Sequence, residues 1–418
     1  MSKFQKTTLA TALLLVTAQS SAAGFQVSEH SASGLGRAFA GEAAVADNAS
    51  VLARNPAAMS RFKQAEFSIV GSYVAPDVNV EGVTDGSPLH GNDPSRLNAD
   101  DIVHSAFVPA AYFIQPINDK FAVGLGLFST YGVATEFEKD YAAGTAAGTT
   151  DLMTFNINPS VSFKATEQLS LGLGLNATYG TATVERYQGD LAGNTPWSPA
   201  GTPVDTTFFE MEGDTWGFGW NAGVLFEFNE ANRIGLAYRS QVDMEFEGEF
   251  TGVPTRGATV DAGLDLPLPA TAEFSGYHAL NEKIAISYSV LWTQWSKFKE
   301  LKAVKADDGS ELFKKSETFD DNLRYSIGAE YTIDQLVLRA GFAYDESAGK
   351  TTLSIPESDR FWYTAGATYN VSPALSLDLG IAYIYSSEVE FEEEAGFVYG
   401  LKSSGDAIIA SAQANYRF

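Results

Sequence analysis

Few residues of the chain have the types and spacing that catalysis or metal binding requires. The four histidines are scattered without the spacing of metal ligands, at His30, His90, His104 and His278. The chain has no cysteine, which excludes catalytic thiols, thiolate metal sites, iron–sulfur clusters and disulfides. It also has no G-x-S-x-G sequence, the nucleophile turn of many serine hydrolases. We therefore predict that the protein is not an enzyme and that it holds neither a metal nor a cofactor.

Two glycine-rich segments match part of a nucleotide-binding motif. Residues 172–177 and 217–222 both fit G-x-G-x-x-A, but a dinucleotide site needs a helix directly after the glycines. Here each segment lies within a run in which apolar residues alternate with small ones, which is the pattern of a strand. The glycines therefore indicate a strand with one small-residue face.

The chain is strongly acidic and moderately apolar. Its 418 residues include 27 Lys or Arg and 52 Asp or Glu, which gives a formal charge of −25, and 45% of the residues are hydrophobic. This charge repels nucleic acid, and no Lys/Arg-rich window offsets it, so no nucleic acid partner is expected. Acids alternate from Asp243 to Glu249 and recur in the run Glu392–Glu394. These acids either bind divalent cations or form a solvated rim, and the rim is the more common arrangement.

The N-terminal residues have the organisation of a secretory signal. Lys3 and Lys6 precede an apolar run over 9–18, and small residues follow at Ser20-Ser21-Ala22. The run is shorter than the roughly 20 apolar residues that a membrane-spanning helix needs, so we predict a signal peptide over 1–22 and not an anchor helix. No later stretch has the length and hydropathy of such a helix. An exported chain of this composition is therefore either a soluble protein or a transmembrane β-barrel.

Apolar residues recur with a period of two through most of the remaining chain. This period, with frequent β-branched and aromatic residues, predicts strands that are apolar on one face. The stripes are clear in 121–128, 169–175, 216–228, 284–292 and 375–385. They predict about fourteen strands, near 64–75, 104–115, 120–133, 153–164, 168–187, 207–228, 232–250, 269–280, 283–300, 318–333, 336–346, 358–370, 374–391 and 400–418.

The lengths of the connections decide between a soluble sandwich and a membrane barrel. Tight turns, as at 115–119 and 281–282, alternate with long polar stretches, as at 76–103, 251–268 and 301–317. An even number of strands with short turns at one end and long loops at the other is typical of outer-membrane barrels, and a β-sandwich has no reason for it. We therefore predict an all-β fold, an antiparallel transmembrane barrel over 64–418 in a bacterial outer membrane.

Residues 23–63 do not have a strand pattern. They are small, polar and rich in glycine up to Gly41, with weak helical character afterwards. A barrel of this size encloses a lumen that leaks unless something fills it, so we predict that 23–63 form a hatch, or plug, inside the barrel. The alternative is a tail outside the barrel. Space for a hatch is expected at small residues on the inner faces of the strands, namely Gly124, Gly126, Gly172, Gly174, Gly217 and Gly219.

Several motifs carry a resemblance to a known family along the whole mature chain. They are Ala23-Gly24-Phe25-Gln26, Ser33-Gly34-Leu35-Gly36-Arg37-Ala38, Arg54-Asn55-Pro56-Ala57, Tyr131-Gly132-Val133-Ala134-Thr135-Glu136-Phe137, Val184-Glu185-Arg186-Tyr187, Trp216-Gly217-Phe218-Gly219-Trp220-Asn221, Leu266-Pro267-Leu268-Pro269 and Asp359-Arg360-Phe361-Trp362. In combination they resemble the FadL family of outer-membrane transporters of long-chain fatty acids and other hydrophobic compounds.

The resemblance implies a fourteen-stranded barrel with an N-terminal hatch, and a route for the ligand. By this resemblance, the ligand binds first between outer loops, then in an apolar inner pocket, and leaves sideways through a gap at a kink in the third strand. The expected partners are a long-chain fatty acid or another hydrophobic small molecule, together with outer-membrane lipid and lipopolysaccharide. The chain is expected to be a monomer. The alternative ligand is a monoaromatic hydrocarbon.

The resemblance also assigns ligand-binding residues. Arg186 and Lys315 match the positions that hold a charged head group, and Phe25 matches a hatch residue that occupies the inner pocket. A carboxylate entering so acidic a barrel needs nearby cations, since screening over about 8 Å makes local pairs outweigh distant acids. From the residues alone, the favoured interpretation is that Arg186 pairs with Glu185 or a neighbouring strand and that Lys315 is a solvated loop lysine. Phe25 could be simple packing.

Further residues match the family's gate. Asn55-Pro56-Ala57 matches the hatch motif beside the wall kink, although by itself it indicates only a rigid turn. We place the kink at Gly132, because glycine within a strand often marks a bend. Asp345 matches an acid near the barrel rim.

Apolar residues in the predicted loops form a candidate landing surface for a ligand. They are Leu191, Trp197, Val204, Val260, Leu264, Leu266 and Leu268. Two other classes of function remain in view. A general porin would have no plug and a charged constriction, and a barrel hydrolase would need histidine beside Ser or Asp at the rim.

Overall fold

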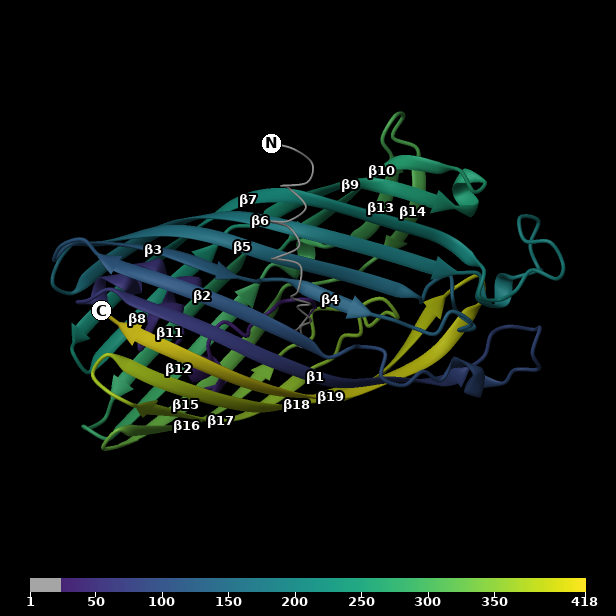
Figure 1. Ribbon diagram of the computed structural model, residues 1–418. Helices are drawn as coiled ribbons and strands as arrows, with labels where there is room; N and C mark the ends of the chain where they lie inside the picture. Colours follow the sequence, from purple (N-terminus) through teal and green to yellow (C-terminus); the bar gives the residue numbers. More distant parts are fainter. Residues whose placement is uncertain (1–23) are drawn as a thin grey trace.

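The computed structural model describes residues 24–418. The predicted signal peptide and Ala23 lie outside the described residues. The rest is an all-β protein in which one antiparallel sheet closes on itself (Figure 1). Closure is made by β1 (Glu66–Thr84) and β19 (Val398–Arg417), whose pairing starts at Glu66↔Arg417. The predicted fold class is confirmed.

Within residues 24–418, nineteen strand segments form fourteen barrel strands because five of these strands are interrupted. The uninterrupted ones besides β1 and β19 are β2 (Ala106–Pro116), β5 (Thr149–Lys164), β6 (Leu169–Tyr187), β7 (Thr207–Asn229), β16 (Leu336–Asp345), β17 (Arg360–Asn370) and β18 (Leu375–Glu394). The interrupted ones are β3 (Phe121–Phe128) with β4 (Gly132–Thr135), β8 (Asn232–Arg239) with β9 (Val242–Gly252), β10 (Thr259–Leu268) with β11 (Thr271–Ala279), β12 (Ile284–Thr293) with β13 (Glu300–Lys305), and β14 (Glu311–Ser316) with β15 (Asn322–Ile333).

Exposure alternates along each strand, as the sequence period predicts. In β7, for example, Trp216, Phe218 and Trp220 are exposed, whereas Gly217 between them is buried. Large apolar side chains therefore cover the outward face, which is the arrangement required of a barrel in lipid. None of the helices in residues 24–418 has the length and apolar character needed to cross a membrane.

The connections alternate in length. We call the end with two- to four-residue connections, such as 230–231 and 117–120, the turn end, and the opposite end the loop end. The predicted number of strands is correct, but two predicted loops are wrong in part. Residues 251–268 contain β10, and 301–317 contain β13 and β14. These segments extend the wall past the loop end (Figure 1), and charged residues of both signs on their outward face hide the apolar alternation.

Residues 24–62 lie within the ring of strands. They contain the short helices α2 (Ala32–Leu35), η1 (Ala49–Ala53) and η2 (Pro56–Arg61). The helix α2 contacts β17, β18 and β19, η1 contacts β2 and β3, and η2 contacts β5, β6 and β7. A single segment can touch strands from so much of the ring only from the inside, and Figure 1 shows it there near the turn end. The other short helices are η3 (Pro94–Leu97), η4 (Gly189–Leu191), η5 (Val253–Thr255) and η6 (Trp295–Lys297).

Small residues on the strands make room for this segment. A side chain at Gly124 would collide with Leu52 and Met59, and one at Gly172 would collide with the backbone of Pro56 and Ala57. Gly126 likewise faces Leu52. In contrast, the other three predicted glycines face neighbouring barrel residues: Gly174 faces Ser160 and Asn221, and Gly217 and Gly219 face the region of Val242.

Candidate ligand-binding site

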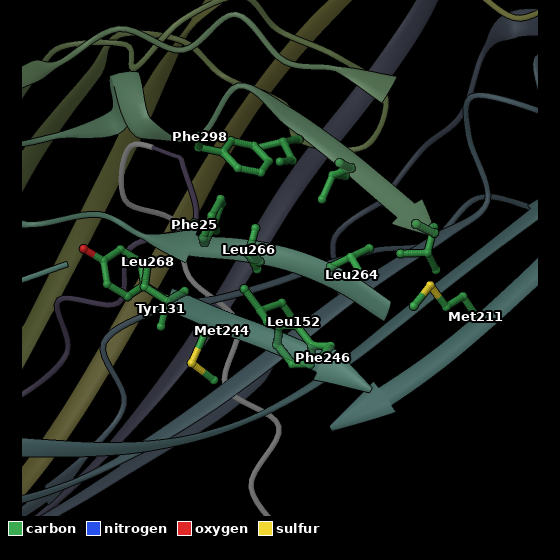
Figure 2. Close-up of a cluster of buried hydrophobic side chains, with 14 of the residues drawn as sticks. Phe25, Tyr131, Leu152, Met211, Met244, Phe246, Leu264, Leu266, Leu268 and Phe298 are labelled. Atoms are coloured by element: carbon green, nitrogen blue, oxygen red, sulfur yellow. The ribbon is translucent and has the colours of Figure 1, made fainter. Parts of the chain in front are cut away.

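An apolar cluster fills the barrel toward the loop end, and Phe25 lies at its centre. The Phe25 side chain is 1% exposed. Its ring meets those of Trp295, Phe298 and Tyr131 edge-on, with centroid distances of 4.7, 5.3 and 5.9 Å. Figure 2 shows the ring beside Leu266, Tyr131 and Phe298. The other members include Leu152, Val184, Phe209, Met211, Met244, Phe246, Phe250, Leu264, Leu268, Leu301, Phe319 and Ile355.

This cluster corrects the predicted landing surface. Leu264, Leu266 and Leu268 belong to β10 and point into the barrel, where they are buried. Val260 also lies on β10, packed against the same cluster. Trp197 and Val204, in contrast, are exposed in the connection between β6 and β7, where the Trp197 ring lies 5.2 Å from that of Phe208. The apolar side chains of 260–268 therefore form part of the inner cluster and not an outer landing surface.

Little free space remains in the cluster. A cavity of about 30 Å³ adjoins Phe25 and is lined mainly by Leu152, Val184, Leu264, Leu301 and other apolar side chains. A cavity of this size holds no more than a few water molecules. A larger molecule can occupy the cluster only where an existing side chain moves away.

Two buried cations lie at the edge of this cluster. Arg186 is fully buried, and its Nη2 donates to the hydroxyl of Ser354 at 2.9 Å. Lys315 Nζ donates to the same hydroxyl oxygen at 3.0 Å. Arg186 also donates to Thr150 Oγ1 at 2.9 Å, and Thr150 lines the cavity beside Phe25. The structure therefore brings Arg186, Lys315 and Phe25 together near the hydroxyl of Ser354, a residue that no sequence pattern distinguishes.

Two carboxylates accompany these cations. Glu393 lies 3.4 Å from Lys315 Nζ, while both carboxylate oxygens of Glu317 are buried without a hydrogen-bond partner among the described residues. Glu317 lies in the connection between β14 and β15, beyond the outward apolar stretch of β15 that begins at Tyr325. Burial raises the pKa of Glu317 to about 7, opposed by the charge of Lys315. Around neutral pH the four charged groups therefore carry a net charge between zero and +1.

The third barrel strand is interrupted at 129–131, between β3 and β4. Below this break, β2 pairs with β3 as far as Ala111↔Leu127. Above it, β4 pairs with β5 from Gly132↔Met153, and the next contact back toward β2 is the bridge Val103↔Thr135. Gly132, the predicted kink, is the first residue of β4 after the break.

The N-terminal segment pairs with the third strand at the break. Val27 N donates to Thr130 O and Gly132 N donates to Phe25 O, both at 2.8 Å. Gln26 and Tyr131 form an isolated antiparallel bridge between these two bonds. Phe25–Val27 thus act as a short extra strand along the third strand, and the same three residues place the Phe25 ring in the apolar cluster.

The remaining predicted gate residues lie away from the break, three in the N-terminal segment and one at the end of a wall strand. Asn55 caps η2 through Oδ1, which accepts from Ala57 N at 3.0 Å, and its Nδ2 donates to Val224 O on β7 at 3.0 Å. Pro56 and Ala57 press against Gly172 of β6. Asp345 is the last residue of β16, buried between Arg324 of β15 and Arg360 of β17 by register. The contacts of Asn55–Ala57 are thus with β6 and β7, whereas Phe25–Val27 contact the break.

Residues 13–418 match the family model described as outer membrane protein transport protein (OMPP1/FadL/TodX). The chain belongs to this family. It is 46% identical to a 47 kDa outer membrane protein of Pasteurella multocida, with 100% of this chain and 99% of that one covered. It is 41% identical to a long-chain fatty acid transport protein of Escherichia coli O6:H1, with 99% of each covered.

Solved structures of the family share the fold. A FadL homologue from Pseudomonas aeruginosa superposes with a TM-score of 0.83 at 23% identity, covering 95% of this chain and 100% of that one. The toluene transporter TodX of Pseudomonas putida gives a TM-score of 0.68 at 16% identity, covering 92% and 97%. Membership confirms an outer-membrane β-barrel that transports hydrophobic compounds, and it confirms that the chain is not an enzyme.

Some residues of the site carry no signal in the sequence. Ser354 and Glu393 lie in long polar stretches, and nothing in their surroundings distinguishes them from solvated loop residues. Trp295 and Phe298 are aromatic and follow β12 closely in the sequence, but nothing in the pattern indicates that the chain turns inward there. Only the closed barrel brings these residues together.

Proposed function

We propose that this protein takes up long-chain fatty acids, with the carboxylate held by Arg186 and Lys315. The observation that carries the proposal is the shared hydroxyl of Ser354, which both cations reach at 2.9 and 3.0 Å beside the apolar cluster. A carboxylate can take the place of this hydroxyl and accept from both cations through charge-assisted hydrogen bonds. The neighbouring apolar cluster then receives the chain of the same molecule.

The acyl chain replaces Phe25 in this proposal. The cavity beside Phe25 holds only about 30 Å³, so a tail of many carbons has to displace the ring. Each CH₂ that enters apolar surroundings contributes roughly 0.8 kcal/mol, and a few CH₂ groups therefore suffice to offset the contacts that the ring loses.

Displacement of Phe25 also explains how the ligand leaves. Phe25–Val27 supply the backbone pairing of the third strand at its break, so a ligand that moves Phe25 also exposes the interruption between Ala111↔Leu127 and Val103↔Thr135. A largely apolar groove of about 680 Å³ lies on the wall nearby, lined by Phe107, Leu127, Phe155 and other residues. We infer that the ligand passes sideways through this interruption into the membrane.

In this proposal the rest of 23–63 forms the fixed part of the hatch. Asn55, Pro56 and Ala57 hold it against β6 and β7, Gly132 permits the bend of the third strand, and Asp345 neutralises Arg324 and Arg360 at the rim. Ion pairs also support a fixed core, since Arg37 pairs with Glu42 at 2.9 Å and with Glu330 of the wall at 2.9 Å. Only the first few described residues then need to move.

The alternative ligand is a monoaromatic hydrocarbon. It is supported by the aromatic lining around Phe25 and by the fold shared with a toluene transporter. A neutral hydrocarbon, however, gains nothing from the cations Arg186 and Lys315, whereas a carboxylate can accept charge-assisted hydrogen bonds from both. We therefore favour the fatty acid.

Uptake and binding measurements test the substrate. Cells that lack their own transporter and express this chain are supplied with labelled oleate or labelled toluene. We expect oleate uptake above that of empty cells, and Arg186→Met and Lys315→Met each weaken oleate binding by the purified barrel by about tenfold, the loss expected for one charge-assisted hydrogen bond. Lys314→Met is the matched control, because Lys314 is the preceding residue, is 40% exposed and pairs with Glu300.

The outcomes separate the alternatives. Faster entry of toluene alone replaces the fatty acid by the hydrocarbon. If neither compound enters faster than into empty cells, the transport proposal is refuted for both. An equal effect of Lys314→Met and Lys315→Met removes the assigned role of Lys315.

A reversible cross-link tests the sideways route. The chain has no native cysteine, and Gln26 and Tyr131 face each other as an antiparallel pair, which suits a disulfide. In the variant Gln26→Cys with Tyr131→Cys, we expect oleate uptake to be low when oxidised and to recover on reduction. Uptake that is unaffected by oxidation, with the cross-link verified by mass spectrometry, would exclude movement of this segment.

A further inference from the structure

A second cationic site lies directly behind the break in the third strand. A cavity of about 30 Å³ there is lined by Gln26 and His30 of the N-terminal segment, by Thr130 and Tyr131 of the break, and by Arg54, Arg239 and Glu273 from the interior, among others. Tyr131 also contacts Phe25 in the apolar cluster. This cavity therefore lies between the inner pocket and the interrupted part of the wall.

The charges around this cavity do not balance. Arg54 and Arg239 both line it, and Glu273 is its only carboxylate among the lining residues of the described chain. Glu273 lies 3.7 Å from Arg54 Nη1, which is a loose pair. Since arginine keeps its proton under all ordinary conditions, the lining carries a surplus of positive charge in a chain whose formal charge is −25.

One of these arginines also has a buried donor without an acceptor. Arg54 Nε is buried and has no hydrogen-bond partner within the described residues, and Arg54 Nη2 reaches Ser28 O only at 3.5 Å. Arg239 is better held, since Nη2 donates to Ala53 O at 2.7 Å and Nη1 donates to Asn176. A buried donor without an acceptor is unfavourable, and an anion in the cavity would satisfy Arg54.

We propose that Arg54 and Arg239 form a second binding station for the carboxylate of the cargo, which holds it between the inner pocket and the break in the third strand. This inference rests on the proposed uptake of fatty acids. When Phe25–Val27 move away, the cavity opens toward Arg186 and Lys315 on one side and toward the wall on the other. The carboxylate then passes from one cation pair to the next and does not cross apolar surroundings unpaired.

The station predicts an effect that depends on the charge of the head group. Oleate and oleyl alcohol have the same chain length and unsaturation, but only oleate carries a carboxylate. In cells expressing Arg239→Met or Arg54→Met, we expect initial oleate uptake to fall about tenfold, the loss of one charge-assisted hydrogen bond. Uptake of oleyl alcohol stays within about twofold, and Arg239→Lys retains more oleate uptake than Arg239→Met because it keeps the charge.

A matched variant separates this role from a structural one. Arg233 lies on the same strand as Arg239 and also holds the N-terminal segment, through Ala44 O at 2.6 Å and through Val45 O, but it does not line the cavity. If Arg239 only fastens the segment, Arg233→Met and Arg239→Met change the uptake of oleate and oleyl alcohol alike. We expect oleate uptake and oleyl alcohol uptake to differ with Arg239→Met but not with Arg233→Met.

One outcome refutes the second binding station and leaves the proposed uptake of fatty acids unaffected. Wild-type oleate uptake above that of empty cells, with oleate and oleyl alcohol affected equally by Arg54→Met and Arg239→Met, refutes the station and leaves fatty acid uptake standing. Oleate binding by the purified variants is measured in parallel and should stay within about twofold of wild type, because Arg186 and Lys315 are intact. A loss of binding as large as the loss of uptake also refutes a station that acts after binding.

Discussion

Replacing Phe25 by alanine should tighten ligand binding. Burying a phenylalanine side chain contributes roughly 1.5–3 kcal/mol, and each edge-on aromatic pair adds about 0.5 kcal/mol or more. With its ring contacts to Trp295, Phe298 and Tyr131, Phe25 is therefore held in the pocket by about 3–4.5 kcal/mol. A ligand tail has to overcome the part of this energy that the displaced ring does not regain elsewhere.

The expected size of the effect follows from this competition. If the displaced ring regains about half of its contact energy elsewhere, the competition costs the ligand about 1.5–2 kcal/mol, which corresponds to a ten- to thirtyfold weaker apparent affinity. Phe25→Ala removes the competition, so oleate should bind ten- to thirtyfold more tightly. Toluene should also bind measurably, because removal of the Phe25 ring leaves an aromatic-lined cavity that suits a single ring. In other proteins, an engineered apolar cavity of about 150 Å³ binds benzene.

Isothermal titration of the purified barrel in detergent measures both affinities. Leu171→Ala is the control, because Leu171 is exposed on the outward face of β6 and has no part in the pocket. Oleate binding that is unchanged or weaker in Phe25→Ala would show that the ring does not occupy the ligand's place, and it would remove the link between the pocket and the break.

Three further predictions concern the cation pair, the interior ion network and the packing of the N-terminal segment. An alkyl sulfonate, whose head group stays ionised, should bind more tightly at pH 6 than at pH 8, because Glu317, with a pKa of about 7, becomes neutral as the pH falls and leaves the site more positive. The Glu317→Gln variant should bind the sulfonate at pH 8 as tightly as wild type does at pH 6. Calorimetric titration of both proteins at both pH values tests this. Arg37→Met should lower the midpoint of thermal unfolding, because three carboxylates within 3 Å of Arg37 lose their shared partner and breaking a buried pair costs about 3–5 kcal/mol, whereas the exposed Lys302→Met should not. Gly172→Val should displace Pro56 and Ala57 and make the barrel leaky to large antibiotics in a growth-inhibition assay, whereas Leu173→Val on the outward face should leave growth unchanged.

The sequence predicts the barrel well because period-two alternation is a local property. Each strand needs only its own residues to show which face is apolar, and the closing pair of β1 and β19 adds no new pattern. The prediction fails at β10, β13 and β14, where the inward residues are largely apolar but the outward residues include charged ones, as at Asp261, Lys302 and Lys314. There the composition matches a loop, although Leu264 and Leu266 alternate with Gly263 and Asp265 as in any strand.

The candidate site is less accessible to sequence reasoning, since it depends on contacts between distant parts of the chain. Arg186, Lys315 and Phe25 could be selected only through resemblance to a family. Ser354, which both cations reach, comes from a connection that folds back into the barrel and has no recognisable pattern. Arg54 and Arg239 belong to segments 185 residues apart, and their shared cavity follows from the way the N-terminal segment lies against β8.

In the proposed route, the break in the third strand links pocket occupancy to the opening of the wall. An unpaired strand edge is unfavourable in a bilayer, and at the break the N-terminal segment provides the missing pairing through Gln26↔Tyr131. The adjacent residue, Phe25, fills the pocket. By the proposed route, a molecule that binds without displacing Phe25 leaves the edge paired and the wall closed, whereas one long enough to displace Phe25 exposes the interruption at the same time. On this argument, selection of the cargo and release of the cargo depend on the same three residues, and an acid whose chain is too short to displace Phe25 should not be transported.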